Sequence, residues 1–214
     1  MTTGGKAAMG AVTATAANPW AAPADEPAAV VDLIRYIKGE DLTARAKAWK
    51  NAHIAGPAAL RPLAALLTDE DIEVTRAARR AMWQIVRDAG RPGADPLRRQ
   101  AVEELVPLLA DGQPRAVRAE VAWMLSEIGG DESVPRLAAL LTDESVREDA
   151  RAALERIPGE QSLAALRAAL AAAPDDYKPA LAASLRVRGV AVPDVPDLKL
   201  VPTKTTTIKP VQPE

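Results

Sequence analysis

The side chains best suited to molecular recognition gather in one stretch, residues 76–87. Arg76, Arg80, Trp83 and Arg87 follow one another at steps of three and four residues, so a helix here would place them on one face. An indole beside guanidinium groups suits the binding of an acidic or aromatic partner, because such clusters are frequent anchors of protein interfaces. The alternative is a solvated arginine face on which the tryptophan covers a neighbouring helix.

Catalytic chemistry finds little support elsewhere in the sequence. The chain has no cysteine and a single histidine, His53, which excludes thiol catalysis and leaves no histidine cluster for a metal. We expect His53 to be a structural residue on the packed side of its helix. An acidic run, Glu144, Glu148, Asp149 and Glu155, is interpreted as a solvated face. The sequence therefore predicts no catalytic residues, no metal site and no cofactor.

Charge and hydropathy narrow the class of partner. The net charge of -2 and the pI of about 5.6 do not favour a general affinity for nucleic acids or anionic membranes. No apolar run is long enough to span a bilayer. We therefore expect the partner to be a protein or a peptide, with acidic character because it would face the arginines, and we regard nucleic acid as an unfavoured alternative.

A repeated helix pair must carry these side chains. From Val102 to Ile128, two apolar runs at helical spacing flank a turn, Asp-Gly-Gln-Pro, that leaves no room for a third element. The first helix keeps four matching apolar positions in four pairs: Val30, Leu33, Tyr36, Ile37; Leu60, Leu63, Leu66, Leu67; Val102, Leu105, Leu108, Leu109; and Val134, Leu137, Leu140, Leu141. The second helix keeps its own stripe in the middle three: Val74, Ala78, Ala81, Met82, Ile85; Val117, Val121, Met124, Leu125, Ile128; and Val146, Ala150, Ala153, Leu154, Ile157.

The second helix of the first pair follows this stripe only loosely. Its best match is Leu42, Ala46, Trp49 and His53, which predicts that Trp49 is buried whereas Trp83 and Trp123 are partly exposed. Trp123 occupies in the third pair the position that Arg80 occupies in the second, and neighbouring pairs of a repeat protein stack. We therefore expect Arg80 and Trp123 to lie near each other. The predicted binding patch consists of Arg76, Arg80, Trp83, Arg87 and Trp123.

The recurring motif, L-x-x-L-L-x-D followed by V-R, resembles HEAT repeats of the short type also seen in phycobilisome-lyase-like proteins. It is clearest from Leu137 to Ile157, its arginine recurs as Arg118, and Thr75 replaces that arginine in the second pair. The resemblance covers residues 26–189. It implies an all-α fold, a right-handed α-solenoid of about five antiparallel helix pairs with the second helices lining the concave face. It also implies binding more often than catalysis.

Two segments flank the predicted solenoid. Residues 1–25 lack a helical stripe and are either a flexible tail or a weak secretory signal with a cleavage box at Ala22-Pro23-Ala24, so export and a cytoplasmic location both stay open. Trp20 is unusual for a tail; it either docks on the folded body or lies near a processing site. Residues 190–214 contain five prolines, a density that favours a disordered, extended tail.

Three functions are compatible with these features. The leading hypothesis is a non-enzymatic HEAT-repeat scaffold or adaptor that binds another protein through its concave face. The second is an enzyme or enzyme subunit, by analogy with phycobilisome-lyase-like proteins. The third is a nucleic-acid-binding HEAT-like module, which the arginine cluster favours and the net charge opposes.

Overall fold

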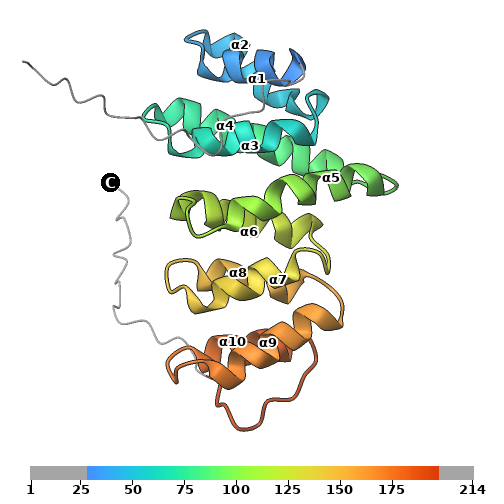
Figure 1. Ribbon diagram of the computed structural model, residues 1–214, viewed down its shortest axis with the longest axis vertical. Helices are drawn as coiled ribbons and strands as arrows, with labels where there is room; N and C mark the ends of the chain where they lie inside the picture. The colour runs from blue at the N-terminus through green and yellow to red at the C-terminus, as the bar shows by residue number, and fades with distance from the viewer. Residues whose placement is uncertain (1–27, 198–214) are drawn as a thin grey trace, which may run out of the picture.

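A computed structural model describes residues 28–197, and all the regular elements within this range are helices (Figure 1). The first helices of the five pairs are α1 (Ala28–Lys38), α3 (Leu60–Ala65), α5 (Asp95–Leu105), α7 (Val134–Ala139) and α9 (Glu160–Ala172). The second helices are α2 (Leu42–Lys50), α4 (Ile72–Ala89), α6 (Arg115–Ile128), α8 (Arg147–Arg156) and α10 (Lys178–Val187). Short 3-10 helices complete several turns: η1 (Ala52–Ile54), η2 (Pro57–Ala59), η3 (Leu66–Thr68), η4 (Val106–Leu109) and η5 (Leu140–Thr142).

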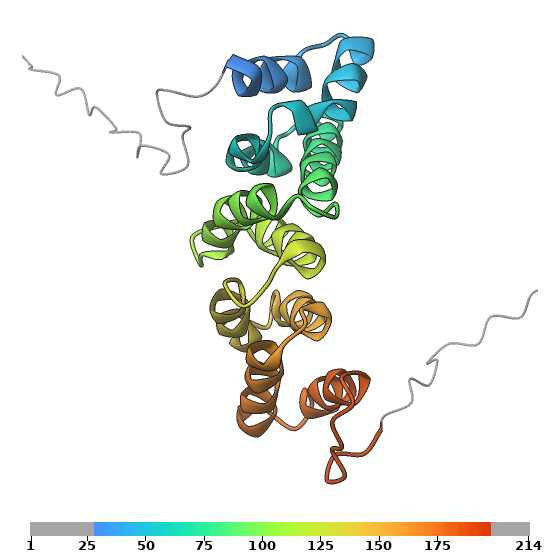
Figure 2. The ribbon, with the colours of Figure 1, turned by 90° about the vertical axis from the view of Figure 1, so that its right-hand side faces the viewer.

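The pairs stack into an α-solenoid with two layers. Figure 2 shows the first helices in one column and the second helices in the other, and the column of second helices follows the inner side of a shallow curve. Helices of neighbouring pairs pack directly, α2 on α4, α4 on α6 and α6 on α8. The predicted solenoid is therefore confirmed, and its concave side is lined by α2, α4, α6, α8 and α10.

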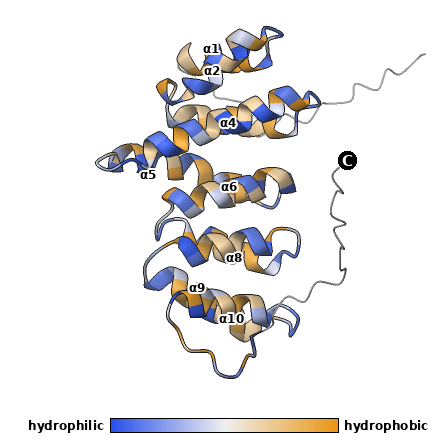
Figure 3. Cartoon of the chain, turned by 180° about the vertical axis from the view of Figure 1, so that it is seen from behind, coloured by the Kyte–Doolittle hydropathy of each residue, from blue (hydrophilic) through white to orange (hydrophobic). Residues whose placement is uncertain are grey.

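The repeated leucines and the second-helix stripe form one core along the whole stack. Leu63, Leu105 and Leu137 of the first helices are fully buried, as are Met82 and Met124 of the second helices. The helices of the concave layer, such as α4, α6 and α8, also keep a hydrophilic side, since hydrophobic and hydrophilic residues alternate around them (Figure 3). This alternation leaves one face of each second helix available for other contacts.

An arginine near the start of the second helix ties one pair to the next. Arg118 is buried and donates to Asp143 at 2.5 Å, and Arg147 forms an ion pair with Asp176 at 3.6 Å. Thr75 takes this position in the second pair and instead donates its hydroxyl proton to carbonyl groups of its own pair. The junction between the second and third pairs therefore lacks the arginine–aspartate link.

In the first pair, the residues predicted to form the packed side of the second helix are not the ones that pack. Leu42 is 68% exposed and His53 is exposed, whereas Arg45 and Ala52 are buried. Arg45 takes the place of the motif arginine, because it pairs with Asp71 of the next pair at 3.6 Å. The true stripe is built from alanines and lies two residues away from the predicted one, so the packed structural role expected for His53 is wrong.

The Asp143 carboxylate gives the arginine–aspartate link a measurable pH dependence. Hydrogen bonds from Ser145 and Arg118 lower its pKa from 3.8 to about 2, so the link stabilises the fold fully above the ordinary pKa and is lost as the pH falls through the lowered one. We expect wild type to have a higher melting temperature than Asp143→Asn at pH 6, with the difference shrinking between pH 4 and pH 2. Calorimetry over this range measures it; a constant difference would contradict the link.

The last described residues fold back on α10. The Arg186 guanidinium donates to the carbonyl oxygens of Val192, at 2.7 Å, and Val195, and Val190 and Val192 pack against the core. Structure therefore continues past Gly189, where the tail was predicted to begin, as far as residue 197. Residues 198–214 and the predicted N-terminal tail or signal, residues 1–25, lie outside the described part of the chain.

Candidate binding surface

The predicted patch is centred on α4, whose orientation is set by its cap and its buried stripe. Asp71 caps the helix by accepting a hydrogen bond from the backbone N–H of Glu73 at 2.8 Å. Val74, Ala78 and Met82 are buried, so the opposite face turns away from the core. Arg76, Arg80 and Arg87 are exposed on that face and Trp83 is half-buried.

Arg80 is held by the preceding pair. Its guanidinium lies 5.2 Å from the centroid of the Trp49 ring on α2, a separation typical of a cation–π contact. Trp49 is half-buried rather than buried, which corrects the expectation for this residue. The stacking partner of Arg80 is thus Trp49 and not Trp123, the neighbour predicted from the repeat register.

Trp83 bridges α4 and α6. Its indole N–H donates to Glu120 on α6 at 2.7 Å, and Arg79 forms an ion pair with the same carboxylate at 3.0 Å. The Arg87 guanidinium lies 5.7 Å from the centroid of the Trp83 ring. Trp83 is therefore fixed in place by a neighbouring helix while it supports a cation on its ring.

Trp123 repeats the same arrangement one junction further along the stack. It is 44% exposed, and its indole N–H donates to Asp149 on α8 at 3.0 Å. Glu120 and Asp149 both stand three residues after the valine that opens the second-helix stripe. The sequence prediction missed these two acceptors, although their shared position was a signal. The interpretation that the tryptophans cover neighbouring helices is therefore correct in part.

The four arginines of α4 differ in whether a nearby carboxylate balances their charge. Arg76 is paired with Glu73 at 2.6 Å, and Arg79 with a glutamate on α6. Within residues 28–197, no carboxylate lies within 4 Å of the Arg80 or Arg87 guanidinium. Two stacked guanidinium groups on the concave side thus keep their charge available to a partner.

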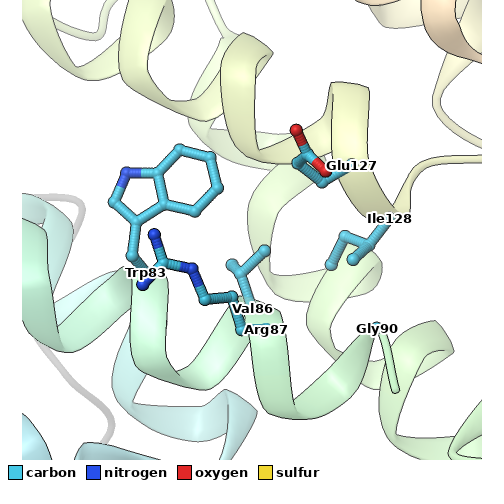
Figure 4. A pocket seen from close by; sticks show the side chains of 6 residues that line it. All are labelled: Trp83, Val86, Arg87, Gly90, Glu127 and Ile128. Atoms are coloured by element: carbon cyan, nitrogen blue, oxygen red, sulfur yellow. The ribbon is translucent and has the colours of Figure 1, made fainter. Parts of the chain in front are cut away.

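A pocket of about 420 Å³ opens beside Trp83, between the ends of α4 and α6 (Figure 4). The Trp83 ring and the Arg87 guanidinium form one wall, while Glu127 stands at the opposite rim, where Arg156 pairs with it at 2.6 Å. The buried side chain of Ile128 lines the pocket from α6. The pocket therefore combines an aromatic wall with an available cation and a carboxylate at the opposite rim.

The end of α4 and α6 approach each other closely at the Gly90 side of this pocket. A Cβ atom placed on Gly90 would lie 2.9 Å from Cγ2 of Ile128, closer than two carbon atoms pack without strain. Gly90 thus permits the contact between the end of α4 and α6 that closes the pocket on this side.

The described residues hold no group of three or more histidine, cysteine, aspartate or glutamate side chains arranged to bind a metal ion. No helix in residues 28–197 has both the length and the hydropathy needed to cross a bilayer.

Stacked antiparallel helix pairs with a recurring leucine motif define the chain as a repeat scaffold of the α-solenoid class. The model of the family described as HEAT repeats matches residues 61–155 and, in a second overlapping match, residues 102–186. The chain therefore belongs to the HEAT-repeat family, as its motifs indicated.

Among curated proteins none matches this chain. A crystal structure of an engineered protein from the Northeast Structural Genomics Consortium aligns with 74% of this chain and 78% of its own length, at 23% identity and a TM-score of 0.38.

Proposed function

We propose that this HEAT-repeat protein is a non-enzymatic scaffold that binds an acidic segment of another protein along α2, α4 and α6. HEAT repeats generally mediate protein interactions, and the concave side of this chain carries the features of a binding surface. The observation that carries the proposal is the state of Arg80 and Arg87. Both guanidinium groups are stacked on tryptophan rings and neither has a carboxylate partner within residues 28–197.

The geometry of the two arginines indicates what they would bind. Arg80 and Arg87 are seven residues apart on one helix, which separates them by about 10 Å along its axis. A planar guanidinium binds a carboxylate through two parallel hydrogen bonds, and stacking reduces the conformational freedom lost on binding. In a peptide extended as a polyproline II helix, two acidic side chains three residues apart lie on the same side and are separated by about 9 Å, because this helix has about 3 residues per turn and rises about 3.1 Å per residue. The surface thus suits an extended segment with acidic residues at this spacing.

The pocket beside Trp83 would receive the part of the segment near the second acidic residue. The Trp83 ring offers an apolar contact for a side chain of the segment, and the cation of Arg87 lies on the same wall of the pocket. A buried aromatic anchor surrounded by weaker polar contacts is the usual energetic organisation of a protein interface.

The alternative functions receive less support from this surface. Acidic side chains are interspersed with the arginines, since Glu73, Glu120, Glu127 and Asp149 all lie beside the patch. A nucleic-acid groove needs a continuous basic track for the phosphates, and these carboxylates interrupt it. An enzymatic role is supported by no grouping of catalytic side chains among the described residues.

Peptide selection tests the proposal and does not require the partner to be identified first. We expect a random peptide library displayed on phage to yield segments with aspartate or glutamate three residues apart. The double variant Arg80→Glu/Arg87→Glu should bind these peptides with an affinity at least tenfold lower. Arg167 is an exposed arginine of α9 in the other layer, so Arg167→Glu should bind them as wild type does. Binding should also weaken with rising salt.

Two outcomes would count against an acidic partner. One is a selection that returns neutral or basic peptides whose binding is the same in the double variant. The other is a gel shift with random-sequence RNA or DNA that is abolished by the double variant while no peptide is selected; this outcome would indicate a nucleic-acid-binding module instead.

A further inference from the structure

The N-terminal end of the solenoid carries an apolar groove unrelated to the α4 surface. It lies between α1 and α2, at one end of the stack in Figures 1 and 2, and has a volume of about 600 Å³. Small side chains such as Ala29 and Ala48 form much of its lining, with Leu33, Tyr36 and Ile54 as its larger walls. Tyr36 is 45% exposed and Ile54 is 71% exposed, so much apolar surface faces outward.

This end of the stack differs from what a terminal repeat requires. An interior pair covers both of its faces with neighbours, whereas a terminal pair needs a polar outer face or a cap. The polar residues at the groove, Asp32, Lys47 and Asn51, stand among apolar ones rather than replacing them. An exposed apolar groove on the outer face of a terminal pair is typical of a surface that another segment or protein covers.

We propose that the segment preceding α1 covers this groove, with Trp20 as the inserted side chain. The described chain starts at Ala28, and the next residue, Ala29, already lines the groove. Trp20 is the single aromatic residue before α1 and precedes Ala29 by nine residues, a length that reaches about 30 Å when extended. Such a short tether raises the local concentration of Trp20 at the groove to the millimolar range.

The chemistry of the groove suits an indole. Small alanines leave space for a large flat side chain, Tyr36 offers an aromatic neighbour, and an indole buries a large apolar area. Its N–H also needs an acceptor. The Asn51 side chain provides one, because its amide nitrogen donates to the carbonyl oxygen of Lys47 at 2.8 Å and its oxygen is left to accept. Trp83 and Trp123 satisfy their N–H groups in the same way, on side-chain oxygens.

Fluorine NMR of the full chain labelled with 5-fluorotryptophan tests this proposal. Trp20→Phe assigns the Trp20 resonance, and mass spectrometry confirms that the purified chain retains residue 20. In the otherwise unaltered chain, we expect a dissolved paramagnetic probe to broaden this resonance only slightly. In Ile54→Lys the broadening caused by the probe should be at least threefold larger. Leu42→Lys is the matched control, because Leu42 is equally exposed but does not line the groove.

Each possible result bears on the proposal. Equal broadening of the Trp20 resonance in the unaltered chain and in Ile54→Lys would overturn it. If the protection of the Trp20 resonance from the probe disappeared on dilution, the proposal would be overturned and a second copy of the chain would be the occupant of the groove. Circular dichroism should be the same for both lysine variants, since both replaced side chains are exposed, and Ala29→Arg serves as a second blocking variant. Binding of acidic peptides should be unchanged in Ile54→Lys, so this test is independent of the proposed function.

Discussion

Replacing Leu125 with alanine is expected to lower the free energy of unfolding by about 2–5 kcal/mol, the cost of truncating a leucine in a packed core. Leu125 is fully buried in α6, in the middle of the stack. No reorganisation of a surface loop can fill the cavity there, because α6 packs on helices of both neighbouring pairs. Urea unfolding followed by circular dichroism measures the change.

The control for this prediction is the same substitution at Leu42. That side chain is 68% exposed, so Leu42→Ala should change the free energy of unfolding by about 0.5 kcal/mol or less. The pair of variants tests the register of the repeats, since the sequence pattern placed both leucines on the packed stripe. Similar losses of stability at both positions would contradict the structure of the first pair.

The second large effect is expected on binding. Trp83→Ala should weaken the affinity for a selected acidic peptide by about 2 kcal/mol or more, roughly 30-fold, as loss of an aromatic anchor does. It should also lower stability, because the indole is half-buried and bonded to Glu120. Isothermal titration calorimetry measures the affinity, at a temperature where circular dichroism shows the variant folded.

Trp83→Phe separates the roles of the ring and of its N–H. Phenylalanine keeps an aromatic wall beside Arg87 but cannot donate to Glu120. We expect this variant to retain most of the affinity while it loses stability. If Trp83→Ala and wild type bound the selected peptide equally well, Trp83 would belong to the scaffold alone and the pocket would not be part of the binding surface.

The fold could be predicted from the sequence because each repeat confirms the others. The stripe that starts at Val74 recurs at Val117 and Val146, and large side chains mark it clearly. The first pair was misplaced since its stripe is built from alanines, which give a weak pattern. The large side chains of Leu42 and Trp49 were therefore aligned with the apolar stripe of the other pairs. Arg45, the motif arginine of this pair, marked the correct alignment.

The exposed face of α4 could be predicted for a similar reason, because helical periodicity alone places Arg80 and Trp83 on it. The contacts of the tryptophans were only partly predictable, because the shared position of Glu120 and Asp149 marks them as candidate acceptors but does not say which indole meets each. Trp83 reaches a carboxylate 37 residues ahead and Trp123 one 26 residues ahead. Which carboxylate an indole meets depends on how far one second helix is shifted along its axis relative to the next. The spacing of the repeats in the sequence does not give this shift. The stacking of Arg80 on Trp49 depends on the same shift.

The placement of the tryptophans has a spectroscopic consequence. Trp49 lies at the contact of α2 with α4, Trp83 at that of α4 with α6, and Trp123 at that of α6 with α8. Three successive junctions of the stack therefore each carry one intrinsic chromophore whose emission responds to the separation of two neighbouring helices. In a solenoid whose repeats contact only their neighbours, variants that each keep one of these tryptophans would resolve the order in which the junctions open, with no label added to the chain.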